Sequence, residues 1–241
     1  MIFAAVLAGG SGRRMGATAL PKQFLTLGGK PVLIHTLEPF LRIPQIDAVF
    51  VLTPPEWIDY TREQIRTCLP SAAVDVTAGG ATRNDTLLCA IRYVCARYPV
   101  DEQTILLTHD AVRPFVTRKM IEENIAAVRE DGACDTVIPA TDTIVRSADG
   151  AFITEIPLRS ELYQGQTPQS FRLLELQRTV GSLTAEETES LTDACKIYAV
   201  RGKKVRLVAG SPSNMKITYA EDLPLAEAIL AARKADEPPV L

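Results

Sequence analysis

The chain has 241 residues, of which 46% are hydrophobic and 23% charged, and its formal net charge is −3. This length and apolar content suit one large α/β domain, and the near-neutral charge does not favour a nucleic-acid or membrane surface as a partner. No apolar run is long enough for a membrane span, and the start lacks the basic segment of a signal peptide. We therefore expect a single cytoplasmic domain over residues 1–241.

The cysteines and histidines exclude several kinds of metal and disulfide site. No Cys-x-x-Cys pair occurs, and the cysteine count is odd, so neither a disulfide framework nor a zinc site is indicated. Only His35 and His109 are present, too few for a multi-histidine metal centre. The five cysteines are expected to be mostly buried in a reducing compartment: Cys68, Cys89, Cys95, Cys134 and Cys195.

Strand-like and helix-like segments alternate along the first 140 residues. The expected strands are Phe3–Leu7, Asp47–Leu52, Ala73–Thr77, Thr104–Thr108 and Asp135–Pro139. The expected helices are Pro31–Phe40, Pro55–Cys68, Arg83–Tyr98 and Thr117–Glu130. Such alternation is typical of a mostly parallel sheet covered by helices on both faces. It predicts an α/β fold with a Rossmann-like, three-layer open sheet.

The alternation breaks near residue 140. Thr141–Ser147 and Ala151–Pro157 flank an Asp149-Gly150 pair, which predicts a β-hairpin arm inserted at about 139–165. The arm is either an extension of the sheet edge or a contact with another subunit. Beyond it we expect helices at Leu173–Val180, Ala185–Ile197 and Ala220–Ala232, with a strand at Lys204–Ala209.

The first strand runs directly into the glycine-rich loop GGSGRRMG. No Gly-Lys-Ser/Thr follows, so this is not a Walker A motif, and Gly16 comes one position too late for a dinucleotide fingerprint. Glycine backbone can nevertheless approach a polyphosphate closely, and Arg13, Arg14 and Lys22 add positive charge. Taken alone, a tight strand-to-helix turn with solvated arginines would explain the loop equally well.

Other polar motifs also fall where ligands bind in open α/β sheets, beyond the carboxyl ends of the strands. Asp110 in HDAVRPF follows a buried strand and could hold Mg²⁺, although an N-cap role is the alternative. His109 is expected to be a packed, hydrogen-bonded residue. Lys216 in NMKIT either points at the site or lies on the surface, and QGQTPQ follows the arm.

The set of motifs resembles one known family. LAGGSGRRMG…PKQF, GGATRNDT, HDAVRPF, QTPQ, LTDA and NMKIT occur in this order in the cytidylyltransferases of polyol phosphates, over roughly Ile2 to Leu230. Two branches compete: one acts on ribitol 5-phosphate, giving the CDP-ribitol of teichoic acid and cell wall synthesis, and one on methylerythritol 4-phosphate for isoprenoid synthesis. The Leu7-Ala8-Gly9-Gly10 start, LYQGQTPQSF and LTDACKIY are more similar to the ribitol branch, since methylerythritol enzymes usually read PAAG and TDDAS there.

The resemblance implies transfer of the CMP moiety of CTP to a polyol phosphate with release of pyrophosphate. Such a transfer needs charge neutralisation and in-line positioning. Carried over residue by residue, Arg14, Lys22 and Lys216 would be catalytic, and Asp110 would hold Mg²⁺ or another divalent cation. The nucleotide would be bound by Leu7, Ala8, Gly9, Gly10, Gly12, Gly80, Arg83, Thr86, Asp110 and Ala111.

The resemblance also implies a homodimer. The acceptor phosphate would be held by Arg113, Thr167 and Thr192, together with Thr143 and Arg159 from the neighbouring subunit's arm. Two alternatives remain open from the residues themselves. The first is the methylerythritol acceptor with the same chemistry. The second is a nucleotide-binding sensor or scaffold that has lost catalysis, which the joint presence of the cationic and acidic site residues disfavours.

Overall fold

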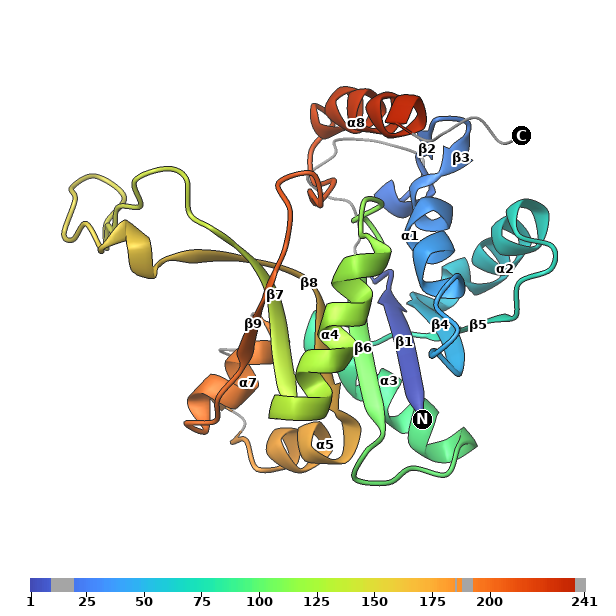
Figure 1. The fold of residues 1–241 in the computed structure, drawn as a ribbon, viewed down its shortest axis with the longest axis horizontal. Coiled ribbons are helices and arrows are strands. Elements are labelled where there is room, and N and C mark those ends of the chain that lie inside the picture. The colour runs from blue at the N-terminus through green and yellow to red at the C-terminus, as the bar shows by residue number, and fades with distance from the viewer. Residues whose placement is uncertain (10–19, 185, 188–192, 237–241) are drawn as a thin grey trace.

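A seven-stranded sheet forms the centre of the protein, which we describe from a computed structural model (Figure 1). The structure describes residues 1–9, 20–184, 186–187 and 193–236. The strands lie in the order β5-β4-β1-β6-β8-β7-β9. Their bounds are β1 Ile2–Leu7, β4 Ala48–Thr53, β5 Val74–Ala78, β6 Ile105–Asp110, β7 Ala133–Pro139, β8 Tyr163–Arg172 and β9 Arg206–Ala209. Because β8 alone runs antiparallel to its neighbours in this sheet, the mostly parallel sheet predicted from the sequence is confirmed.

Helices cover both faces of the sheet, and the alternation of side chains along β1 explains how. Ala4 and Val6 belong to a core shared with α1, α2 and α4, whereas Phe3 and Ala5 belong to a core shared with α3, α5 and α7. Successive side chains of a strand point to opposite faces, so each face is apolar. The helices are α1 Val32–Leu41, α2 Ile58–Cys68, α3 Arg83–Arg97, α4 Arg118–Asp131, α5 Leu173–Gly181, α7 Ala194–Val200 and α8 Asp222–Asp236.

A smaller unit lies above the carboxyl ends of the strands. It contains a two-stranded antiparallel sheet of β2 (Thr26–Leu27) and β3 (Lys30–Pro31), preceded by a 3₁₀ turn at Lys22–Phe24. Leu27 and Val32 share a third apolar cluster with Ile217 and with Ala226 of α8. This packing holds the segment that follows Lys22 against the segment that follows Lys216, at the carboxyl ends of the strands. The remaining 3₁₀ turns are Pro55–Trp57 and Arg159–Glu161. None of the described helices is both long and apolar enough to cross a membrane.

Helix starts follow local sequence signals. At α3, Thr82 and Asp85 form a capping box in which each side chain accepts from the other's backbone N–H. At α4 the Thr117 side chain accepts from Met120 N, so Thr117 is the N-cap and the cap alternative for Asp110 is wrong. Asp110 instead ends β6, two residues beyond the predicted strand end at Thr108.

Three sequence predictions need correction. The segment Tyr163–Arg172, for which the sequence predicted no strand, is the ten-residue strand β8. Its glycine, proline and glutamines hide the strand pattern, but its polar side chains from Gln166 to Ser170 are buried and hydrogen-bonded to other parts of the fold. The helix expected over Ala185–Ile197 is also wrong, because Asp193 has extended backbone and caps a new helix that starts at Ala194.

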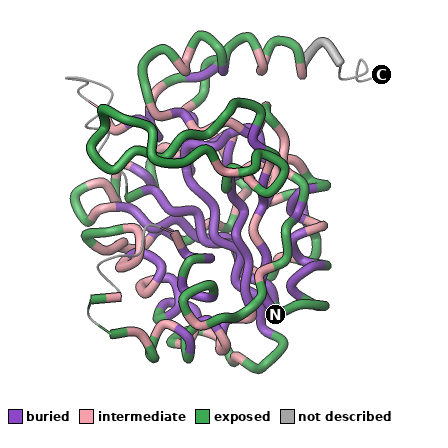
Figure 2. Tube along the Cα trace, turned by 90° about the vertical axis from the view of Figure 1, so that its left-hand side faces the viewer, coloured by how far each residue is buried: buried purple, intermediate pink, exposed green. Residues whose placement is uncertain are grey.

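The third correction concerns the arm, residues 140–162, which leaves the sheet between β7 and β8 and projects away from it (Figure 1). A regular hairpin was expected, but only an isolated antiparallel bridge joins Arg146 and Glu155. The predicted turn is present: Gly150 has φ +73° and Asp149 Oδ1 accepts from the N–H groups of Ala151 and Phe152. The arm has no sheet layer to pack against within the chain, and it is exposed along its length (Figure 2).

Candidate functional site

A cavity of about 190 Å³ opens at the carboxyl ends of β1 and β6. Its walls come from the residues that end these strands, the 3₁₀ turn of Lys22, the first turn of α3 and the loop of Lys216. Lys22 and Lys216 are separated by almost 200 positions in sequence, yet both line this cavity. The predicted site residues that line it are Leu7, Ala8, Gly9, Lys22, Arg83, Thr86, Asp110, Ala111 and Lys216.

The other predicted residues lie elsewhere. Arg113 and Thr167 are buried and contact Asp110, while Thr143 and Arg159 are exposed on the arm. Gly80 does not line the cavity: its N–H donates to Thr86 Oγ1 at 3.1 Å, and a Cβ on it would lie 2.1 Å from Asp85 Cβ. A glycine is required there so that the loop can approach α3. Gly10, Gly12, Arg14 and Thr192 lie outside the described residues.

Asp110 is the acidic centre of the cavity wall. Its Oδ2 lies 2.9 Å from Lys216 Nζ and 3.4 Å from Arg113 Nε, and its Oδ1 lies 3.7 Å from Arg83 Nε. Burial on its own raises the pKa of this carboxyl, but Lys216, Arg83 and Arg113 together hold it well below its usual value. Asp110 is therefore ionised at neutral pH, with three cationic side chains from three different segments around it.

β8 holds the segments that carry these cations. Arg113 Nη1 donates to the carbonyl oxygen of Asn214 at 2.8 Å, two residues before Lys216. The Asn214 side-chain amide in turn donates to Gln166 Oε1 at 3.1 Å and to the Thr167 carbonyl at 2.9 Å. Because all of these groups are buried, their hydrogen bonds fix the loop of Lys216 against the end of β6.

His109 fixes the backbone of Asp110 through Thr167. His109 Nε2 lies 3.1 Å from the Arg113 carbonyl oxygen, which can only accept, so Nε2 carries the proton. Burial lowers the pKa of His109 to about 4, so the ring is neutral and Nδ1 accepts from the Thr167 hydroxyl at 2.9 Å. Thr167 Oγ1 then accepts from Asp110 N at 3.1 Å. The sequence interpretation of His109 as a packed, hydrogen-bonded residue is confirmed.

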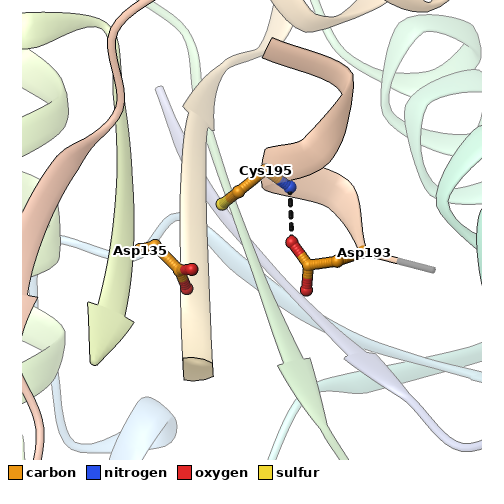
Figure 3. Close-up of side chains that lie close together, drawn as sticks. All are labelled: Asp135, Asp193 and Cys195. Atoms are coloured by element: carbon orange, nitrogen blue, oxygen red, sulfur yellow. Dashed lines mark hydrogen bonds between the residues drawn. The ribbon is translucent and has the colours of Figure 1, made fainter. Parts of the chain in front are cut away.

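A second polar group lies beside the cavity, across β8 (Figure 3). Side-chain ligand atoms of Asp135, Asp193 and Cys195 lie within 4.8 Å of one another, a grouping that could accept a metal ion. Three of the carboxylate oxygens already have donors: Gln169 Nε2 donates to Asp135 Oδ1 at 3.0 Å and to Asp193 Oδ2 at 2.7 Å, and Cys195 N donates to Asp193 Oδ1 at 2.8 Å. The Gln169 amide therefore joins the two acids.

Sequence reasoning missed the residues that orient the site rather than line it. Gln23 is 1% exposed and its amide donates to the Ala8 carbonyl at 2.8 Å, so it fixes the end of β1. Gln166 and Gln169 are buried on β8, and Asn214 is fully buried beside them. Each lies inside a quoted motif, PKQF, QTPQ or NMKIT, but its function depends on contacts across the sheet that spacing alone does not reveal.

Comparison with known proteins supports one family. The chain is 47% identical over 233 residues to the ribitol-5-phosphate cytidylyltransferase of Lactiplantibacillus plantarum, covering 97% of this chain and all of that protein. Among solved structures, a 4-diphosphocytidyl-2C-methyl-D-erythritol synthase from Anaerococcus prevotii is 27% identical with a TM-score of 0.78, covering 95% of this chain and 96% of the other. A 2-C-methyl-D-erythritol 4-phosphate cytidylyltransferase from Thermus thermophilus is 26% identical with a TM-score of 0.70, covering 96% and 100%.

The family match extends over residues 2–232, which include every strand of the sheet and all the described residues of the cavity wall. The α/β fold and the enzyme class expected from the motifs are therefore confirmed. The chain belongs to the family described as IspD, 2-C-methyl-D-erythritol 4-phosphate cytidylyltransferase.

Proposed function

We propose that this protein transfers the CMP moiety of CTP to ribitol 5-phosphate, giving CDP-ribitol and pyrophosphate for teichoic acid synthesis. One observation carries the nucleotidyl transfer: two lysines and an arginine from separate segments, Lys22, Lys216 and Arg83, line one cavity at the carboxyl ends of β1 and β6. A triphosphate carries about four negative charges, and cationic side chains with backbone N–H donors are what such a ligand requires. The acceptor is supported by the 47% identity to a ribitol-5-phosphate cytidylyltransferase over 97% of the chain.

In this proposal, the acceptor phosphate oxygen attacks the α-phosphorus of CTP, and the bond to the β-phosphate oxygen breaks as pyrophosphate leaves. Lys22 and Lys216 stabilise the negative charge that develops on the transferred group, and Arg14 joins them from the glycine loop. Leu7, Ala8 and Gly9 offer backbone groups to the nucleotide. Gly9 lies close to Thr86: a Cβ on Gly9 would be 3.4 Å from Thr86 Oγ1. The end of β1 and the first turn of α3 therefore pack against each other in this wall.

Asp110 is suited to hold a divalent cation beside the phosphates. Among the described residues that line the cavity it is the only carboxylate, and the surrounding cations keep it ionised. Mg²⁺ commonly binds one or two carboxylates together with substrate phosphates, so this donor set fits it. Bound there, Mg²⁺ would offset charge on the triphosphate. Lys216 and Arg83, which balance Asp110 in the absence of a nucleotide, would then be available to phosphate oxygens.

The arm supports a homodimer. Phe152 is 74% exposed, and Ile153, Ile156 and Leu158 are each at least 60% exposed. Apolar side chains gathered on one projecting segment are typical of a surface that another chain covers. A second copy of this chain is the proposed partner, and Thr143 and Arg159 of its arm would reach the acceptor at the neighbouring cavity.

The acceptor is tested by measuring pyrophosphate release with CTP and Mg²⁺ and with ribitol 5-phosphate or methylerythritol 4-phosphate in parallel. We expect rapid turnover with ribitol 5-phosphate and at least about 100-fold lower kcat/KM with the other acceptor. Preference for methylerythritol 4-phosphate would overturn the acceptor assignment. CTP binding without turnover on either acceptor would favour a nucleotide sensor instead.

A further inference from the structure

Gln169 is buried between Arg83, which lines the cavity, and the acidic residues Asp135 and Asp193 of Figure 3. It lies on β8, opposite Thr108 of β6 on one side and opposite Asp135 of β7 on the other. Its side chain contacts three charged groups: the carboxylates of Asp135 and Asp193 and the guanidinium of Arg83. No other side-chain amide described in the structure has three charged partners of this kind, and the reaction assigned above does not use it.

The partners fix the orientation of the Gln169 amide. Arg83 Nη2 can only donate, and it donates to Gln169 Oε1 at 2.9 Å. The Nε2 group then faces the two carboxylates, at 3.0 Å from Asp135 Oδ1 and 2.7 Å from Asp193 Oδ2. The flipped amide would put a carbonyl oxygen against the Asp193 carboxylate and N–H groups against the Arg83 guanidinium. Both contacts would be repulsive, so a single orientation is stable.

Arg83 is the group that this orientation controls. It is the first residue of α3, it lines the cavity, and its Nε lies 3.7 Å from Asp110 Oδ1. A free arginine side chain has many rotamers, and holding it in one geometry costs conformational entropy. The hydrogen bond that Arg83 Nη2 donates to Gln169 Oε1 gives the guanidinium a buried, uncharged anchor beside its contact with Asp110. The Asp193 carboxylate, 4.0 Å from Arg83 Nη1, adds an electrostatic contribution.

We propose that Gln169 is a positioning residue of the transfer reaction, which holds the Arg83 guanidinium in the cavity in the orientation that binds the nucleotide. This inference rests on the proposed function, because it assigns to Arg83 a contact with CTP. It explains why an uncharged amide lies between two carboxylates: a charged residue of either sign would neutralise one partner and repel another. Gln169 itself touches no substrate and acts through Arg83.

The test is a double-mutant cycle read by CTP affinity. Gln169→Met keeps the length of the side chain and removes both its donor and its acceptor. We expect it to weaken CTP binding, measured by calorimetry without acceptor, roughly tenfold. Arg83→Ala should weaken binding at least as much, and Gln169→Met should add less than about a further twofold in the Arg83→Ala background, because its effect passes through Arg83. Gln164→Met, an exposed position on the same strand, is the matched control and should bind CTP like the wild type.

Kinetics separate positioning from a general structural defect. With Gln169→Met we expect the KM for CTP to rise roughly tenfold while the KM for the acceptor stays within about twofold. Equal losses for both substrates, or full additivity with Arg83→Ala, would overturn the inference. Wild-type protein is titrated with CTP first: absence of binding there would refute the proposed function, whereas normal wild-type binding with an unaffected Gln169→Met protein would refute only the role of Gln169.

A second pair of variants covers the case in which Gln169→Met does not fold. Gln169→Glu places a carboxylate oxygen opposite Asp193, and Gln169→Glu combined with Asp193→Asn restores a donor there. Asparagine can also keep the cap that Asp193 makes to Cys195 N. The double variant should therefore bind CTP at least about fivefold more tightly than Gln169→Glu alone. A double variant no better than the single one would contradict the proposed orientation of the amide.

Discussion

The cavity and the arm differ in which side chains they bury. The cavity lies at the ends of β1 and β6, and the arm comprises residues 140–162. Around the cavity, charged and polar groups are buried and joined to one another: Asp110 has three cationic neighbours, and Thr167 and Gln169 connect it to the rest of the sheet. On the arm, apolar groups such as Phe152 are exposed. Buried charges need partners that neutralise them, whereas an exposed apolar patch is typical of a surface where another molecule binds.

β8 belongs to both regions. Its first residues, Tyr163 to Gly165, are exposed at the base of the arm, and the residues from Gln166 onward are buried beneath the cavity. A movement of the arm would therefore act on the same strand that orients Arg83 and the loop of Lys216. The described residues of the cavity wall all come from one chain, whereas the arm carries the exposed apolar side chains for which we propose a second copy as partner.

The largest expected effect comes from removing a cation of the cavity. Lys22→Ala should lower kcat/KM about 100- to 1000-fold, because a charge that stabilises the transition state is worth ~3–4 kcal/mol. Lys216→Ala should have an effect of the same order. Steady-state pyrophosphate release measures both, with Lys119→Ala, an exposed lysine of α4, as the control. Near-normal turnover by a folded Lys22→Ala protein would contradict a catalytic role for Lys22.

Asp110→Asn should destabilise the fold as well as impair activity. Removing one member of a buried charge cluster costs about 3 kcal/mol, since Lys216, Arg83 and Arg113 lose their common partner. Urea unfolding at pH 7 measures the loss, and Asp59→Asn, which breaks an exposed pair with Arg62, should cost less than about 1 kcal/mol.

The pH dependence of this loss has a definite sign. The pKa of Asp110 lies below its usual value in the folded state, so its charge stabilises the protein above about pH 4, and this contribution disappears as the pH falls further. The difference in unfolding free energy between wild type and Asp110→Asn should therefore shrink below about pH 4. A difference that stays constant down to pH 2 would contradict the ion-pair cluster.

Phe152→Asp tests the arm. If a second copy covers this surface, a charge there should weaken the dimer by about 2 kcal/mol, which raises its dissociation constant roughly 30-fold. Sedimentation or light scattering across a dilution series gives the measurement, with Leu225→Asp on the exposed side of α8 as the control. A wild type that is monomeric at all concentrations would overturn the arm's proposed partner.

The last prediction concerns the stability of the fold rather than activity, at Asp135. Burial raises its pKa to about 7 from 3.8, so the folded state binds a proton more tightly than the unfolded chain does. The free energy of unfolding therefore falls as the pH rises from about 4 to 7 and levels off above that. Asp135→Asn keeps an acceptor for Gln169 but cannot ionise. It should be more stable than the wild type at pH 8 and similar to it at pH 4.

Thermal or urea unfolding at several pH values measures this profile. The exposed arm residue Asp142, changed to asparagine, is the matched control and should leave the profile of the wild type unaltered. An Asp135→Asn protein that loses stability at pH 8 would show that the carboxylate is required in its charged form.

Local sequence signals were enough for the strands and helices whose patterns are strong. Short apolar runs such as those of β1 and β4 are typical of buried strands, and the Thr82 capping box marks the start of α3, because these signals depend on neighbouring residues alone. The same is true of the Asp149-Gly150 turn. The polar motifs after β1 and β6 were also expected at one edge of the sheet, since the carboxyl ends of parallel strands meet there, whereas cavity residues such as Arg83 and Thr86 were expected from the family resemblance.

Tertiary structure alone decided the rest. β8 is polar in sequence, and it is a strand because Gln166, Thr167 and Gln169 find hydrogen-bond partners on β6, β7 and the Lys216 loop, none of which is near in sequence. The arm is irregular because, within one chain, its apolar residues have no layer to pack against. A buried polar side chain needs hydrogen-bond partners that only the fold brings near it, whereas an apolar side chain needs only exclusion from water. The core could therefore be predicted from the sequence, and the hydrogen-bond network that orients the site could not.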